Sequence, residues 1–221
     1  MATMIQLTRS DAATLPAYLA EGPDRAPGVV LVQEWWGLND QIKALADRLA
    51  AEGFHVIVPD LYRGDVLTTV AEANHRMSQL NWADAATQDI PAALALLHAQ
   101  QRKVAVMGFC MGGALTILSA ATVPGMEAAV CFYGIPELAA ADPAQLQCPL
   151  LCHFATEDDW CTAELVGQLE EWLQSGKVRY ELHWYEAKHA FMNDRRPEVY
   201  NVQAATLAWN RSLEFLKHHL R

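Results

Sequence analysis

A short segment in the middle of the chain, residues 103–113 (Lys-Val-Ala-Val-Met-Gly-Phe-Cys-Met-Gly-Gly), constrains the fold more than any other stretch. Residues 104–107 are a continuous apolar run, which is typical of a strand buried on both faces. Glycines flank Cys110, and the small residues of 114–121 predict a helix directly after it. A strand, a glycine-flanked nucleophile and a helix form the arrangement of a Gly-x-Ser-x-Gly elbow, here with cysteine in place of serine.

The geometry of such an elbow explains why glycine stands two positions before and after the cysteine. The turn is so tight that a side chain at Gly108 or Gly112 would collide with neighbouring backbone. The Cys110 thiol then lies above the sheet at a helix N-terminus, whose dipole favours a thiolate. A structural alternative is that Cys110 is a small buried hydrophobic residue beside glycines that allow close packing. The position between a buried strand and a helix favours the nucleophile.

The composition indicates a globular chain and excludes several classes of partner. The 221 residues include 26 acidic and 16 basic side chains, for a formal charge of −10, so nucleic acid and anionic membrane surfaces are poor partners. No apolar run reaches the roughly eighteen residues that a membrane span needs, and the N-terminal residues lack the pattern of an export signal. The five cysteines show no paired spacing, which indicates reduced thiols and hence a cytoplasmic protein.

Buried strands and amphipathic helices alternate along the chain. An antiparallel hairpin is expected around residues 5–8 and 17–20, followed by strands at 28–33, 55–59, 104–107, 128–133, 150–155 and 180–185. Helices are expected after Asn39 or Asp40 and at 69–81, 84–100, 114–121, 164–174 and 201–219, the last with Leu207, Leu213 and Leu216 facing the core. This alternation predicts a single α/β domain over residues 1–221, with a mostly parallel sheet and helices on both faces.

Reactive side chains follow several of these strands, at the edge of the sheet where α/β proteins bind ligands. The candidates are Glu34, Cys110, Asp158 or Asp159, Lys188 and His189. A nucleophile, an acid and a histidine in this chain order match the triad of the α/β-hydrolases. Plainer alternatives remain open, since either aspartate could cap a helix and His189 could be a solvated loop residue. Glu34 could be a solvated carboxylate too, but two neighbouring tryptophans would partly desolvate it and raise its proton affinity.

These motifs together resemble the dienelactone hydrolase family, α/β-hydrolases that use Cys, Asp and His to open lactones and hydrolyse some esters. The resemblance extends from about Pro27 to Leu220 and is carried by Gly-Phe-Cys-Met-Gly-Gly, Gln-Glu at 33–34, Asp158 and His189. It also includes Asp-Leu-Tyr at 60–62 and Phe-Tyr-Gly at 132–134. The resemblance implies an α/β-hydrolase fold.

The resemblance also implies a role for each member of the site. Cys110 matches the nucleophile, His189 the base, and Asp158, rather than Asp159, the orienting acid. Glu34 matches an additional glutamate that is implicated in holding and activating the thiol when substrate enters. The oxyanion-hole donors correspond to the backbone N–H groups of Trp35 and Met111.

The substrate-binding residues depart from the family pattern. The archetype binds the carboxylate of its substrate with two arginines, and this chain has Asn193 and Ala71 at those positions. Arg195 and Arg196 are close in sequence and could substitute for them. Trp82 and the two tryptophans after Glu34 predict a more aromatic pocket. The expected substrate-binding residues are Trp36, Asn193 and Arg195.

The sequence therefore predicts an enzyme that hydrolyses a small-molecule ester or lactone through an acyl-thioester, without a cofactor or metal, as a monomer or homodimer. Two other classes remain as alternatives. One is a thiol-based redox sensor, in which Cys131 or Cys161 would have to lie close to Cys110. The other is an α/β-hydrolase scaffold that binds a ligand without catalysis.

Overall fold

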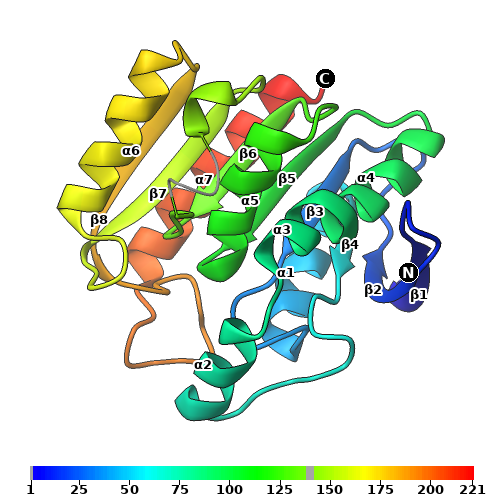
Figure 1. Ribbon diagram of the computed structural model, residues 1–221, viewed down its shortest axis with the longest axis horizontal. Helices are drawn as coiled ribbons and strands as arrows, with labels where there is room; N and C mark the ends of the chain where they lie inside the picture. The colour runs from blue at the N-terminus through cyan, green and yellow to red at the C-terminus, as the bar shows by residue number, and fades with distance from the viewer. Residues whose placement is uncertain (1, 138–141) are drawn as a thin grey trace.

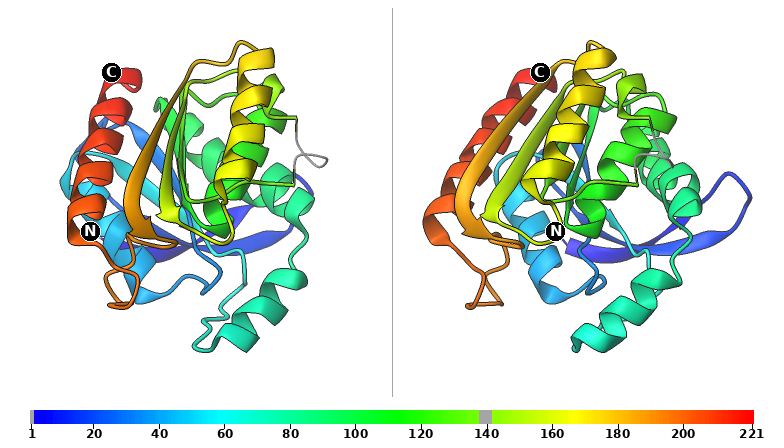
Figure 2. Two further views of the ribbon diagram at one scale, coloured as in Figure 1. Left: turned by 90° about the vertical axis from the view of Figure 1, so that its left-hand side faces the viewer. Right: turned by 60° about the vertical axis from the view of Figure 1, so that its left-hand side comes forward.

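The computed structural model describes residues 2–137 and 142–221, which form an eight-stranded sheet with helices on both faces (Figures 1 and 2). The strands are β1 (Ala2–Thr8), β2 (Thr14–Ala20), β3 (Gly28–Val32), β4 (His55–Pro59), β5 (Val104–Phe109), β6 (Ala128–Phe132), β7 (Leu150–Glu157) and β8 (Tyr180–Lys188). The α-helices are α1 (Asp40–Ala51), α2 (Val70–Ser78), α3 (Trp82–Asp84), α4 (Ile90–Ala99), α5 (Met111–Thr122), α6 (Ala163–Ser175) and α7 (Val202–His219). The predicted alternation of strands and helices is confirmed.

The strand order, β1-β2-β4-β3-β5-β6-β7-β8, confirms the mostly parallel sheet and its antiparallel entry hairpin. β2 is antiparallel to both of its neighbours, β1 and β4. The remaining pairs, from β4–β3 to β7–β8, are parallel. The chain passes from β3 to β4 on one side and then returns to β5 on the other side of β3. Such a reversal opens a crevice at the carboxyl ends of β3 and β5, and ligands bind in such crevices of open α/β sheets.

The central strands are buried along their whole length because helices cover both faces of the sheet. Helices α1 and α7 pack on one face, and α4, α5 and α6 on the other (Figure 2). Leu213 and Leu216 of α7 are buried as expected, but the prediction for Leu207 is wrong, since it is 47% exposed. Trp209 takes the core position instead, because residues two apart on a helix point to nearly opposite sides.

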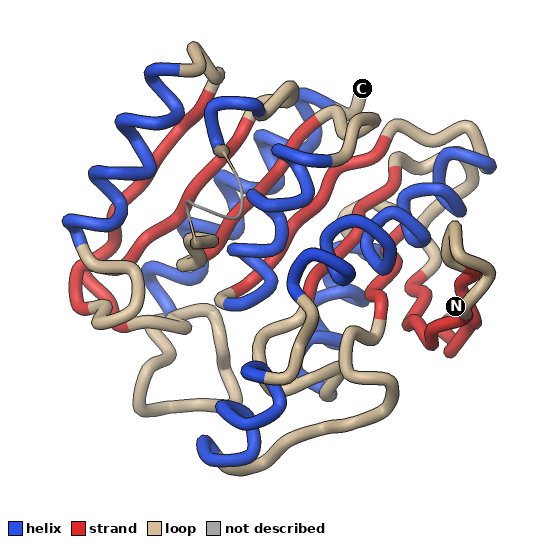
Figure 3. Tube along the Cα trace, viewed as in Figure 1, coloured by secondary structure: helices blue, strands red, loops and turns tan. Residues whose placement is uncertain are grey.

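Two segments lie beyond the carboxyl ends of the strands, α2 and the connection at residues 189–201 (Figures 1 and 3). α2 begins at a capping box in which Thr69 and Glu72 satisfy each other's backbone N–H groups. The helix expected at 84–100 consists of α3, a π-helical turn at Ala85–Asp89 and α4. The two segments and the start of this helical region contribute walls to the site described next.

Candidate active site

Cys110 occupies a sharp turn between β5 and α5. Its backbone has φ 54° and ψ −118°, a conformation that residues with a side chain rarely adopt. Its N–H donates to the Phe132 carbonyl at 2.9 Å, and its carbonyl accepts from the Ala114 N–H at 3.1 Å. Met111 is the first residue of α5, so its N–H has no partner within the helix. The elbow predicted from the glycine pattern is present.

Close backbone contacts leave no room for a side chain at either glycine of the elbow. A Cβ at Gly108 would overlap the carbonyl oxygen of Gly112. A Cβ at Gly112 would overlap Val32 O and lie 2.6 Å from Gln33 O. The first turn of α5 therefore packs directly against β5 and the end of β3, which holds Cys110 above these strands.

We expect Gly108→Ala to lower the free energy of unfolding by at least about 3 kcal/mol, because backbone must move to admit the methyl group. A matched control is Gly167→Ala in α6, where the added Cβ meets nothing within 4 Å. This control should be neutral or stabilising by up to about 1 kcal/mol, since alanine is the better helix former. Urea denaturation of both variants measures the difference. Equal effects at the two positions would contradict a sterically required elbow.

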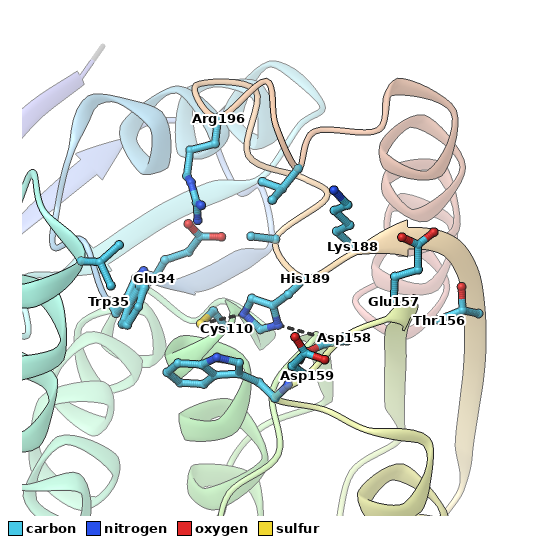
Figure 4. A pocket seen from close by; sticks show the side chains of 14 residues that line it. Glu34, Trp35, Cys110, Thr156, Glu157, Asp158, Asp159, Lys188, His189 and Arg196 are labelled. Atoms are coloured by element: carbon cyan, nitrogen blue, oxygen red, sulfur yellow. Dashed lines mark hydrogen bonds and ion pairs between the residues drawn. The ribbon is translucent and has the colours of Figure 1, made fainter.

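Three side chains from distant parts of the chain form a continuous hydrogen-bonded series at the carboxyl edge of the sheet (Figure 4). His189 Nε2 lies 3.1 Å from Cys110 Sγ, and His189 Nδ1 lies 2.8 Å from Asp158 Oδ2. The other carboxylate oxygen of Asp158 accepts the backbone N–H groups of Trp160 at 2.8 Å and Cys161 at 2.9 Å. Both carboxylate oxygens thus accept hydrogen bonds, which fixes the carboxylate and, through it, the imidazole ring.

The hydrogen-bonded series shifts the pKa values of His189 and Asp158. Burial acts to lower the pKa of His189, but its hydrogen bonds with Asp158 and Cys110 outweigh that effect and raise the pKa to about 10. Burial acts to raise the pKa of Asp158, but the hydrogen bond and charge of His189 hold it below its ordinary value. These shifts favour an imidazolium paired with the Asp158 carboxylate at neutral pH.

The raised pKa of His189 predicts how stability depends on pH. The unfolded chain releases this proton near pH 6.5, whereas the folded protein keeps it until about pH 10. The stabilisation is therefore fully present below pH 6.5 and is lost as the pH rises to about 10. We expect the difference in free energy of unfolding between wild type and His189→Gln to shrink across this window, measured by urea denaturation.

His183→Gln provides the control for that experiment. Burial lowers the pKa of His183, so its ring is neutral in both the folded and the unfolded state above about pH 7. Its effect on the free energy of unfolding should be constant between pH 7 and 10. A pH-independent difference for His189→Gln as well would contradict the imidazolium.

Glu34 follows β3 and is 3% exposed on the wall beside Cys110. Its Oε1 accepts a hydrogen bond from the Tyr133 hydroxyl at 3.1 Å, and its Oε2 accepts one from the Asn193 side-chain amide at 2.8 Å. Burial raises the pKa of Glu34 above its ordinary value, and the two hydrogen bonds offset only part of this effect. Glu34 is thus the desolvated carboxyl group that the sequence suggested, not a solvated loop residue.

Cys110 lies between two pockets of different character. The larger, of about 670 Å³, is lined by Glu34, Trp35 and Arg196, which lie near one another, and by Lys188 and Glu157 farther across (Figure 4). The smaller, of about 130 Å³, is lined mainly by apolar side chains. Trp160 and His189 border both pockets. Cys110, although only 6% exposed, therefore borders both pockets.

The relationship to known proteins agrees with this geometry. The model of the dienelactone hydrolase family matches residues 15–220. The chain belongs to the dienelactone hydrolase family. It is 31% identical over 214 residues to protein usf of Aquifex pyrophilus, with 92% of this chain and 93% of that protein covered. It is 29% identical over 234 residues to a carboxymethylenebutenolidase of Rhodococcus opacus, with 98% and 91% covered.

The fold of the solved relatives is the same. A dienelactone hydrolase-like promiscuous phosphotriesterase from metagenomic libraries superposes with a TM-score of 0.86 at 24% identity, covering 100% of this chain and 99% of that chain. The predicted α/β-hydrolase fold and the hydrolase class are confirmed. No helix in residues 2–137 or 142–221 has the length and hydropathy needed to cross a membrane.

The residues expected to bind substrate in this family member lie together, but not in the pocket of about 670 Å³. Trp36, Asn193 and Arg195 line a neighbouring pocket of about 530 Å³, which shares Val70 and Arg196 with the larger one. Asn193 is only 2% exposed and is held by Glu34. The arginine on the wall beside the nucleophile is Arg196, whose guanidinium stacks over the Trp36 ring at 5.5 Å.

Sequence reasoning missed two aromatic members of the site. Trp160 is 48% exposed, and its ring centroid lies 5.3 Å from that of Trp35 and 5.9 Å from that of His189. Tyr133 is fully buried and combines the hydrogen bond to Glu34 with an edge contact to the His189 ring at 5.0 Å. Phe-Tyr-Gly at 132–134 was part of the family resemblance, and this motif was the available signal for Tyr133.

One group among the described residues could bring three donor atoms to a metal ion. Donor atoms of Asp158, Cys161 and His189 lie within 4.8 Å of one another. Two of these three residues are already hydrogen-bonded to each other, so an ion would have to replace that bond. The hydrogen bond between Asp158 and His189 accounts for their closeness.

Proposed function

We propose that this protein hydrolyses a carboxylic ester or lactone by a Cys110–His189–Asp158 triad through an acyl-thioester. The observation that carries the proposal is the series of two hydrogen bonds, 3.1 Å and 2.8 Å long, that joins the cysteine at the elbow to the buried aspartate. The carboxymethylenebutenolidase among its relatives supports a lactone or ester substrate. The placement of Cys110 between two pockets supports a substrate with groups on both sides of the scissile bond.

In the first half-reaction the Cys110 thiolate attacks the carbonyl carbon. The oxyanion that develops is held by the backbone N–H groups of Trp35 and Met111, donors that need no reorganisation during the reaction. The carbon–oxygen bond to the leaving group then breaks, and the His189 imidazolium gives its Nε2 proton to the departing alkoxide. The neutral imidazole that remains is kept in the correct tautomer by Asp158.

The second half-reaction removes the acyl group. Neutral His189 accepts a proton from water, and the hydroxide attacks the thioester carbonyl while the same two N–H groups hold the oxyanion. Collapse releases the carboxylic acid, and the thiolate–imidazolium pair is restored. With a lactone, the alcohol remains tethered to the acyl group, and one open-chain hydroxy acid leaves.

Glu34 has a supporting place in this proposal. Both of its carboxyl oxygens accept hydrogen bonds, one from Tyr133 and one from Asn193, and burial raises the pKa of the group. These two hydrogen bonds hold Glu34 on the wall beside Cys110, where the family resemblance places a group that holds and activates the thiol. Arg196, rather than Arg195, faces the larger pocket, so a carboxylate on the substrate would meet Arg196.

Burial argues against the redox-sensor alternative. Cys161 borders the smaller pocket together with Cys110, but desolvation raises the pKa of the Cys161 thiol well above its ordinary value. The pKa of Cys131 is raised by the same cause. A protonated thiol is a poor resolving nucleophile, so neither cysteine is suited to trap an oxidised Cys110 as a disulfide.

The proposal is tested by mixing the protein with short aryl esters and unsaturated lactones and following product release. The same reactions, quenched in acid, are measured by intact mass and peptide mapping. We expect turnover, together with a mass increase equal to the acyl group on the peptide that contains Cys110. Turnover that persists after Cys110 has been fully alkylated would falsify the nucleophile assignment.

A further inference from the structure

The smaller pocket beside Cys110 is apolar on the side away from the triad. Its wall comes from Met77 of α2, Trp82 of α3, Ala114 of α5 and Ile135 after β6. Ala114 is 3% exposed, and the other three pack against the apolar core on that face of the sheet. The pocket volume is about 130 Å³, slightly below that of an apolar protein cavity of about 150 Å³ that holds a benzene molecule.

The two pockets next to Cys110 therefore favour different parts of a substrate. The smaller one favours an aliphatic group, because a charged or polar group placed there would lose its hydration without gaining partners. The larger one holds Lys188, Arg196, Glu157 and Asp159, which suits a polar or charged group. A substrate that fills both pockets is apolar on one side of its carbonyl and polar on the other.

The order of events in the proposed reaction assigns the smaller pocket to the acyl group. The alcohol must leave first, while the acyl group is still bound to Sγ, and water must then reach the thioester near His189. The larger pocket provides a route for both. An alcohol seated in the smaller pocket would have to leave past the acyl group.

We propose that the smaller pocket is an acyl-binding subsite, which makes this enzyme selective for esters of short aliphatic acids. This inference rests on the proposed hydrolase function and adds the class of acyl group. The volume accommodates about four or five carbon atoms beyond the carbonyl, by comparison with benzene in its cavity. Ala114 and Ile135 set the depth, since a larger side chain at position 114 would occupy the space and a smaller one at 135 would extend it.

The test is the dependence of kcat/KM on acyl length for p-nitrophenyl esters from acetate to octanoate. We expect kcat/KM to rise about fourfold with each methylene from acetate to butanoate, because burying one methylene group favours binding by about that factor. It should fall by at least about tenfold between the best ester and octanoate. Ile135→Ala should move the optimum to longer acyl groups, and Ala114→Leu to acetate. One variant enlarges the pocket and the other fills it, so the test remains valid if either variant fails to fold.

Val199→Ala is the matched control, because Val199 lines the larger pocket. Its ratio of octanoate to butanoate kcat/KM should equal that of wild type. Turnover with a flat or steadily rising dependence on acyl length would overturn the subsite and leave the hydrolase function standing. The absence of turnover with every ester, including acetate, would remove both.

Discussion

Replacing Cys110 with alanine is expected to lower kcat for ester hydrolysis by at least about four orders of magnitude. A triad acts as a unit, so loss of the nucleophile removes nearly all of its contribution and leaves only what substrate binding and the oxyanion donors supply. No other side chain takes the elbow position, where φ is 54° and the sulfur lies 3.1 Å from His189 Nε2. The measurement is kcat for the best ester found in the panel, with active protein quantified by its folded fraction.

Loss of activity must be separated from loss of the fold. Circular dichroism and the urea midpoint of Cys110→Ala should remain close to those of wild type, since the substitution removes one sulfur atom from a side chain at the edge of a pocket. Cys148→Ala provides the comparison, because Cys148 is a buried thiol that lines none of the pockets beside Cys110. We expect it to retain wild-type kcat. Substantial hydrolysis by a folded Cys110→Ala protein would require a different nucleophile.

Asp158→Asn is expected to lower kcat by about 10³ to 10⁴, although the two side chains have the same shape. The backbone N–H groups of Trp160 and Cys161 donate to one side-chain oxygen and will retain the amide oxygen there. The amide NH₂ must then face His189 Nδ1, which becomes an acceptor. The imidazole proton moves to Nε2 and points at the sulfur, so the ring can no longer take a proton from water.

The adjacent carboxylate provides the control for Asp158→Asn. Asp159 also lines the larger pocket but is exposed, and His189 contacts Asp158 instead. We expect Asp159→Asn to change kcat by less than tenfold, measured in the same assay and at the same pH. Equal losses for the two substitutions would contradict the assignment of Asp158 as the orienting acid.

The parts of the site that the sequence predicted well are those with strict local requirements. An elbow needs glycine on both sides of the nucleophile, and at Gly108 and Gly112 the backbone contacts confirm that requirement. The order of strands and helices followed from apolar runs that helices cover on both faces. Asp158 was distinguished from Asp159 by the family motif alone, and its hydrogen bond to His189 agrees with that choice.

The remaining contacts depend on packing that no local pattern encodes. Asn193 was expected to meet substrate because of its distance from His189 in sequence, but in the fold it donates to Glu34. Arg195 and Arg196 are neighbours in an irregular segment, where the direction of each side chain is set by tertiary contacts. Only Arg196 stacks on Trp36 and lines the larger pocket. Leu207 is a different case, because the helical period that places Leu213 and Leu216 in the core already puts Leu207 on the opposite face.

The segments that form the walls of the site differ in how well they tolerate changes of sequence during evolution. The segment 189–201 carries His189 and holds Glu34 through Asn193, so altering its length displaces groups that the chemistry needs. α2 contributes Val70 to the larger pocket beside Cys110 and Met77 to the smaller one, and it carries none of Cys110, Asp158 and His189. Substitutions on this helix can alter which acids and alcohols fit while leaving the reaction intact. Diversification of this enzyme, natural or in the laboratory, should therefore accumulate first on α2.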